Sequence, residues 1–107
     1  MTLKEKLENL KTRCENAGFN YAYGKFDEPT PPPHLVAIIV DTDNFMADNR
    51  VYYGSISIQL DYTYTVKDLE EQEKIENKIL GNIAWNKTEE TYLQDEDVWQ
   101  VSYFFEI

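Results

Sequence analysis

The chain contains little of what enzymatic and metal sites are made from. Its 107 residues include one cysteine, one histidine and four glycines, and no glycine-rich loop occurs. The single cysteine, Cys14, allows no disulfide within the chain, which fits a reducing compartment. His34 has no neighbouring pattern that supplies a second metal ligand or an orienting partner. We therefore expect no catalytic residue, no cofactor and no metal, and a protein that works through its surfaces.

Long apolar runs are also missing. The longest, Leu35 to Val40, is far shorter than the roughly 20 residues of a membrane-spanning helix. The first ten residues, MTLKEKLENL, lack the apolar stretch of a secretory signal. These two features predict no membrane partner and a chain that is made and assembled in a cytoplasm.

Positive charge is scarce relative to negative charge. Ten Lys and Arg face twenty Asp and Glu, which gives a formal net charge of −10. Binding to nucleic-acid phosphate or to anionic membranes needs clustered Lys and Arg, so both are disfavoured. The charge can keep the protein soluble, meet a basic partner, or line a surface that nucleic acid passes without binding.

The length and composition predict one folded domain spanning residues 1–107. Apolar residues make up 42% of the chain and aromatic residues 14%, which is too much for a disordered protein.

Residues 2–40 predict one helix followed by two strands. Thr2 with Glu5 forms a capping box, and apolar residues recur at helical spacing as far as Ala17, where Gly18 ends the helix. Phe19 to Phe26 reads as a short strand. A proline-rich loop follows over residues 27–33, and the apolar run from residue 35 to residue 40 reads as a central strand.

Residues 51–107 predict a long strand, a helix and two more strands. Val51 to Tyr64 has a period of two, with Ile56, Ile58, Leu60, Tyr62 and Tyr64 on one face. A helix follows with cap signals at Thr65 and Asp68 and ends at Gly81. Strands are expected over residues 85–93 and 98–107. The apolar side expected for the second helix consists of Val66, Leu69, Ile75, Ile79 and Leu80.

The predicted fold class is therefore α+β. The order α-β-β-β-α-β-β favours a mostly antiparallel sheet of four to five strands with two helices packed on one face.

Three patterns could carry chemistry, and none is specific. Asp41, Asp43 and Asn44 begin like a calcium loop, but the later ligand positions hold Phe, Met and Tyr. Cys14 is expected to pack in the core, and a Cys14–His34 pair has no supporting pattern. Acidic pairs are too numerous for any one of them to indicate a glycosidase site.

Two features point to contacts with partners. Glu76 falls on the apolar side of the second helix, which suggests either a rim carboxylate or a contact with a basic group of another subunit. Most aromatic residues are expected in the core, but Tyr53 and Phe104 fall on the second face of the sheet, as interface residues do.

Longer stretches of the chain resemble a known family. They are the proline-rich loop, F-x-A-D-N-x-x-Y at residues 45–52, the acidic helix at residues 68–76, W-N-K-x-E-x-x-Y at residues 85–92 and V-W-Q-V-x-Y at residues 98–103. This pattern resembles small tail-assembly proteins of phages and prophages of Gram-positive bacteria, namely tail terminators, also called tail-completion proteins.

The resemblance implies an α+β fold and a ring, commonly a hexamer, that caps the tail tube. It further implies a structural protein of the virion that joins tail to head, with the major tail protein and a head-completion protein as partners. It supplies no catalytic residues. Our own interface hypothesis has two parts. A polar loop over residues 45–50 projects toward a partner and contacts it through Phe45, Met46, Asp48, Asn49 and Arg50. Tyr53 and Glu76 are two further predicted contact residues.

Other functions remain open on the sequence alone. The chain could be another head–tail connector or a minor tail protein. It could also be an acidic inhibitor or immunity protein that binds a basic partner. An enzyme is disfavoured because no nucleophile–base constellation is found.

Overall fold

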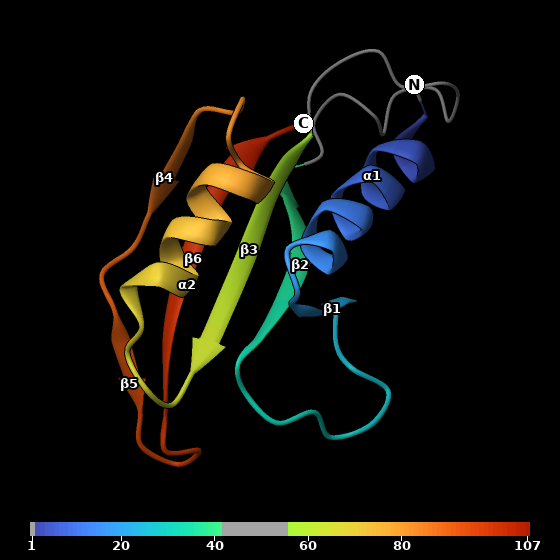
Figure 1. The fold of residues 1–107 in the computed structure, drawn as a ribbon. Helices are drawn as coiled ribbons and strands as arrows, with labels where there is room; N and C mark the ends of the chain where they lie inside the picture. The colour runs from blue at the N-terminus through green and yellow to red at the C-terminus, as the bar shows by residue number, and fades with distance from the viewer. Residues whose placement is uncertain (1, 42–55) are drawn as a thin grey trace.

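A computed structural model describes residues 2–41 and 56–107 of the chain. The described part is one domain in which two helices lie on the same face of a mixed six-stranded sheet, which confirms the expected α+β class (Figure 1). The elements in chain order are α1 (Leu3–Asn16), β1 (Asn20–Tyr23), β2 (His34–Asp41), β3 (Ser57–Tyr64), α2 (Leu69–Lys74), the π-helical turn η1 (Ile75–Ile79), β4 (Trp85–Lys87), β5 (Thr91–Leu93) and β6 (Val98–Glu106).

The sheet has the strand order β1-β2-β3-β6, and both β4 and β5 pair with the outer side of β6. All pairings are antiparallel except the parallel pair β1–β2. The expected count of four to five strands is too low because the predicted strand over residues 85–93 divides into β4 and β5. Thr88 interrupts it, since its N–H donates to the Ser102 carbonyl while its hydroxyl accepts from the Ser102 N–H.

Helix α1 begins and ends as the sequence predicts. The Thr2 hydroxyl accepts from Glu5 N–H at 3.1 Å, and the Glu5 carboxylate accepts from Thr2 N–H at 2.9 Å. At the other end Gly18 has a φ of 91°. The Phe19 N–H donates to the Cys14 carbonyl and the Gly18 N–H to the Glu15 carbonyl, which is the Schellman arrangement. The helix therefore carries its own start and stop signals.

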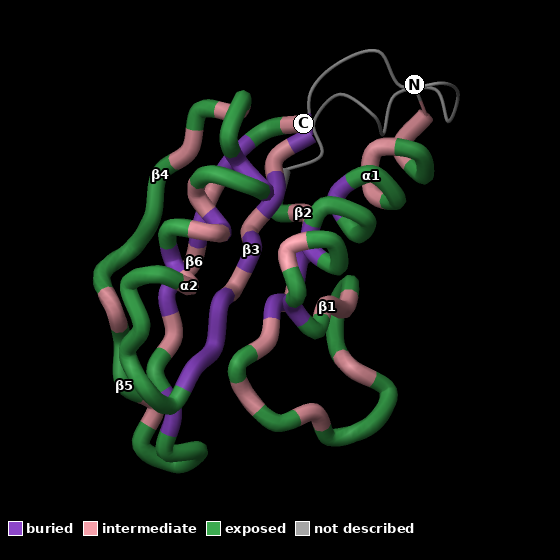
Figure 2. Tube along the Cα trace, viewed as in Figure 1, coloured by how far each residue is buried: buried purple, intermediate pink, exposed green. Residues whose placement is uncertain are grey.

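Buried residues alternate with more exposed ones along much of the central strands (Figure 2). Helix α1 lies over the β1–β2 side and α2 over β3 and β6, and together they cover one face (Figure 1). The alternation predicted for residues 51–64 is confirmed over β3, while residues 51–55 lie outside the described residues. Every apolar residue of the inner face of β3 has an exposed fraction of 1% or less. The inner-face residues of β3 and the residue before it are Ile56, Ile58, Leu60, Tyr62 and Tyr64.

The second helix departs from the expected apolar side. Its cap is Asp68, whose carboxylate accepts from Glu70 N–H at 3.0 Å. After Lys74 the helix widens into the π turn, where Leu80 N–H donates to the Ile75 carbonyl. Ile75, Ile79 and Leu80 are buried as expected, but Val66 is 76% exposed and Leu69 is 62% exposed. Val66 precedes the helix and Leu69 is its first residue, whereas Gln72, three residues before Ile75, shares the inward side and is buried.

Candidate functional site

Six of the seven predicted interface residues lie outside the described residues. They are Phe45, Met46, Asp48, Asn49, Arg50 and Tyr53. The calcium-like positions Asp43 and Asn44 lie outside them as well. The described residues on either side of residues 42–55 lie close together, because Asp41 at the end of β2 pairs with Ser57 at the start of β3.

The seventh predicted interface residue, Glu76, is described, and its carboxylate binds groups of its own chain. Its Oε2 accepts from Lys87 Nζ at 2.7 Å and from the Tyr103 hydroxyl at 2.8 Å, and its side chain is 19% exposed. The Lys87 ammonium also lies 5.8 Å from the ring centres of Trp85 and Tyr103. These contacts explain within one chain why an acidic residue stands on the apolar side of this helix.

A polar network extends from Glu76 across the space between α2 and the β4–β5 segment. Gln72 Nε2 donates to Glu90 Oε1 at 3.0 Å, and Lys87 Nζ donates to Gln72 Oε1 at 3.4 Å. Lys67 pairs with Glu90 at 3.2 Å. The hydrogen bond from Gln72, reinforced by Lys67, lowers the pKa of Glu90. The network ties the second helix to the interruption between β4 and β5.

The tyrosines of the helix-covered face are neutral, buried groups. Burial raises the pKa of Tyr62 to about 12 and also raises the pKa of Tyr103, where the Glu76 carboxylate adds to the effect. Burial also raises the pKa of Tyr64, and the nearby Glu90 carboxylate adds to the effect. These groups give the covered face an aromatic core with a few polar contacts at its rim.

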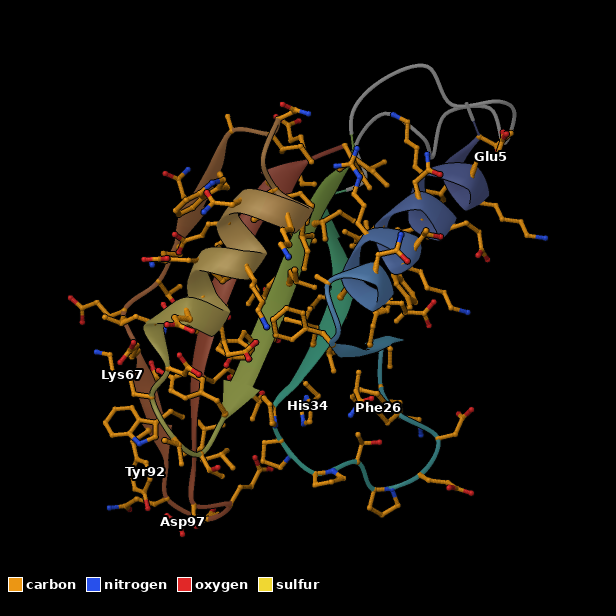
Figure 3. The ribbon with its side chains drawn as sticks, in the orientation of Figure 1. Glu5, Phe26, His34, Lys67, Tyr92 and Asp97 are labelled. Carbon is orange, nitrogen blue, oxygen red and sulfur yellow. The ribbon has the colours of Figure 1, made fainter. Side chains whose placement is uncertain are left out.

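Cys14 and His34 cannot act as a pair because they lie on opposite faces of the sheet. Cys14 is a fully buried residue of α1, and burial raises the pKa of its thiol to about 12. His34 alternates with the buried Leu35 and so points to the other face, where its ring meets Phe26 with the centres 5.1 Å apart (Figure 3). Partial burial lowers the pKa of His34.

The second face of the sheet carries neither of the two described helices (Figure 1). Val36 and Ile38 on β2 and Phe104 on β6 are partly exposed there, and Val40 is 45% exposed. The position predicted for Phe104 on this second face is confirmed. Among these apolar side chains, Asp61 accepts from Gln59 at 2.8 Å and from Ser102 at 2.6 Å. The face is thus a mixture of apolar area and fixed polar groups, as protein interfaces are.

Metal and membrane features are not found in the described part. Within residues 2–41 and 56–107, no group of three or more His, Cys, Asp or Glu side chains is placed to hold a metal ion. Neither of the two described helices is long and apolar enough to cross a membrane.

Comparison with known proteins adds no relative. No protein-family model matches the chain, and neither the curated proteins nor the solved structures contain a significant match to it.

Proposed function

We propose that this chain is a structural subunit of a phage or prophage tail, of the tail-terminator type. In this role several copies form a ring at the head-proximal end of the tail tube and join the tail to the head. The sequence pattern over residues 31–33, 45–52, 68–76, 85–92 and 98–103 is the first support for this function. The α+β fold agrees with what that resemblance implies.

The observation that carries the proposal is the uncovered face of the sheet. A free-standing domain has little reason to place Val36, Ile38 and Val40 along one strand, and Phe104 two strands away, on a face that no described helix covers. A subunit in which a neighbouring subunit or the tail tube covers this face has such a reason. The Asp61 cluster with Gln59 and Ser102 supplies fixed hydrogen-bonding groups for such a contact.

The charge of the chain supports the same function. Phage DNA passes through the joint between head and tail, so the ring must not hold phosphate. A chain with a net charge of −10 has weak affinity for phosphate, since that affinity comes from Lys and Arg that release counterions.

The interface hypothesis at the polar loop is retained as part of this proposal. Phe45, Met46, Asp48, Asn49, Arg50 and Tyr53 remain the predicted contacts with a neighbouring subunit or with the tube. Glu76 keeps its predicted contact role at the rim, although its carboxylate already binds Lys87 and Tyr103.

Two variants test the proposal on tail tubes assembled from the major tail protein. Ile38→Lys places a charge on the uncovered face, and deletion of residues 45–50 removes the loop. Both are expected to abolish binding to tube ends, measured by co-sedimentation and electron microscopy, while circular dichroism shows a folded chain. Lys78→Glu, at an exposed position on the helical side, is the control and is expected to bind normally. Normal capping of tubes by both altered chains would reject the proposal.

An acidic inhibitor is the second candidate, favoured by the uneven distribution of charge. Residues 56–107 contain twelve Asp and Glu but only four Lys and Arg. This function predicts a monomer that binds one basic protein tightly at low salt and weakly at high salt. A different connector or minor tail protein would instead be identified by the position of its gene relative to the gene of the major tail protein.

A further inference from the structure

The two edges of the sheet, β1 on one side and β5 on the other, carry surfaces of different shape. At the β1 end, a groove of about 500 Å³ runs between α1 and β1. Leu3 and Leu7 from the helix and Tyr21 from the strand form its apolar walls, and Tyr23 beside them is 49% exposed. The charged residues along the groove are Lys4, Glu8 and Lys11.

The outer edge of β1 is open to a further strand. β1 pairs only with β2 among the strands that the structure describes. Gly24 N–H donates to the Ala37 carbonyl on β2. Because N–H groups alternate in direction along a strand, those of Tyr21 and Tyr23 point away from β2. An unpaired edge beside an apolar groove is a surface that a strand or side chains of another molecule can fill.

The opposite end of the sheet carries a projecting aromatic pair. Tyr92 on β5 and Trp99 on β6 face each other with ring centres 5.3 Å apart, and they are 43% and 39% exposed. The Tyr92 hydroxyl donates to Asp97 at 2.5 Å, which fixes its orientation (Figure 3). We call this end, made of Tyr92, Trp99 and the acidic residues Glu89, Asp95 and Asp97, the aromatic end.

The charges of the two ends are complementary. Residues 2–41, which form α1, β1 and β2, contain five Lys and Arg and six Asp and Glu, so this half is nearly neutral. Residues 56–107 contain four and twelve. Lys4 and Lys11 are exposed and make no ion pair with a described residue. The groove thus offers two ammonium groups beside the single carboxylate of Glu8, and the aromatic end offers several exposed carboxylates.

We infer that the aromatic end of one copy of this chain binds in the β1 groove of the next copy. The occupant is a second copy because the chain itself carries both an apolar groove with basic groups and an aromatic projection with acidic groups. The two surfaces lie at opposite ends of one sheet, so one domain cannot bring them together. The contact is therefore head to tail, the type that closes into a ring or grows into a filament. This inference rests on the proposed function and supplies the contact between neighbouring subunits of the ring.

Charge reversal on each side gives a stringent test. One variant carries Lys4→Glu and Lys11→Glu in the groove, and the other carries Glu89→Lys and Asp95→Lys at the aromatic end. In each variant alone, the groove and the aromatic end then carry charges of the same sign and repel each other. An equal mixture restores opposite charges at every contact, because each groove meets the other variant's aromatic end.

We expect wild-type chain to self-associate at low salt, each variant alone to associate at least about tenfold more weakly, and the mixture to regain association. Sedimentation velocity measures all three. A double variant Lys74→Glu, Lys78→Glu changes the net charge as the groove variant does and is expected to associate like wild type. Tyr92→Ser is expected to weaken association by about tenfold or more, as loss of an aromatic anchor does.

Three results would overturn the inference. They are a wild-type chain that stays monomeric at millimolar concentration, variants that each associate as wild type does, and a mixture that is no stronger than its components. Rings that form normally from both charge variants would place the subunit contact elsewhere while leaving the tail-terminator function standing. Conversely, charge-dependent filaments or dimers that never cap a tail tube would support the contact and reject the function.

Discussion

The two faces of the sheet are built from the same strands and serve different purposes. On β3, Leu60 faces the helices and is fully buried, while its neighbour Gln59 faces outward and donates to Asp61. On β2, Ala37 is fully buried, while Ile38 beside it stays partly exposed. The helix-covered face holds the domain together. The other face keeps partly exposed apolar side chains and the hydrogen-bonded Asp61 cluster, and the proposed assembly function assigns this face to a partner.

Truncation of the covered face is expected to have the largest effect on stability. Leu60→Ala leaves a cavity under α2 and should reduce the free energy of unfolding by about 3 kcal/mol. Gln59→Ala at the adjacent outward position should change it by less than about 0.5 kcal/mol. Urea unfolding followed by circular dichroism measures both. Equal losses from the two variants would show that the faces do not differ as described.

Disruption of the Glu76–Lys87 ion pair at the rim of the covered face is expected to have the second-largest effect on stability. Glu76→Gln removes the charge that Lys87 and Tyr103 bind and should cost about 1–2 kcal/mol of unfolding free energy. Lys87→Met removes the partner, and the double variant should lose less than the sum of the two single losses. Strictly additive losses would mean that Glu76 and Lys87 do not interact energetically, and would strengthen the predicted contact of Glu76 with another subunit.

Alkaline pH tests the aromatic core of the same face. The pKa of Tyr62 is raised from 10.0 to about 12 by burial, and the pKa of Tyr103 is raised as well. A raised folded-state pKa contributes stability that is complete below pH 10 and is lost as the pH rises toward 12. Unfolding free energy should therefore fall over this range, and Tyr62→Phe should make the fall shallower. Urea unfolding at stepped pH checks this, and an unchanged slope in the variant would contradict it.

The uncovered face should show the smallest effect on the isolated chain. Ile38→Ser should change the unfolding free energy by less than about 1 kcal/mol, because the side chain is only partly buried. The same substitution should markedly weaken binding to tail tubes, measured by co-sedimentation. A large loss of stability without any loss of binding would assign this face to the fold rather than to assembly.

Local signals in the sequence predicted most of the fold. The capping box at Thr2, the Gly18 stop and the strict alternation of β3 depend on neighbouring residues, so each could be found without the structure. The π turn after Lys74 and the exposure of Leu69, which was expected on the apolar side, were not indicated by the local sequence. The parallel pairing of β1 with β2 and the break between β4 and β5 arise from contacts distant in sequence.

The candidate surfaces were harder to predict for the same reason. Glu76 stood out as a charge on an apolar side, but its partners Lys87 and Tyr103 lie 11 and 27 residues away. Trp99 falls in the same alternation as the inward residues Val101 and Tyr103 of β6. It shares their face, yet it is 39% exposed because the second helix does not extend over that end of the sheet. Periodicity indicates which face a residue occupies, but not whether another element covers it.

The mass of the chain in solution, measured by light scattering alone and with tail tubes, tests the assembly function most directly. A structural tail subunit should give a closed ring of several copies, visible by electron microscopy in solution or at tube ends. A mass of 12.6 kDa at every concentration, together with no binding to tubes, would contradict that function.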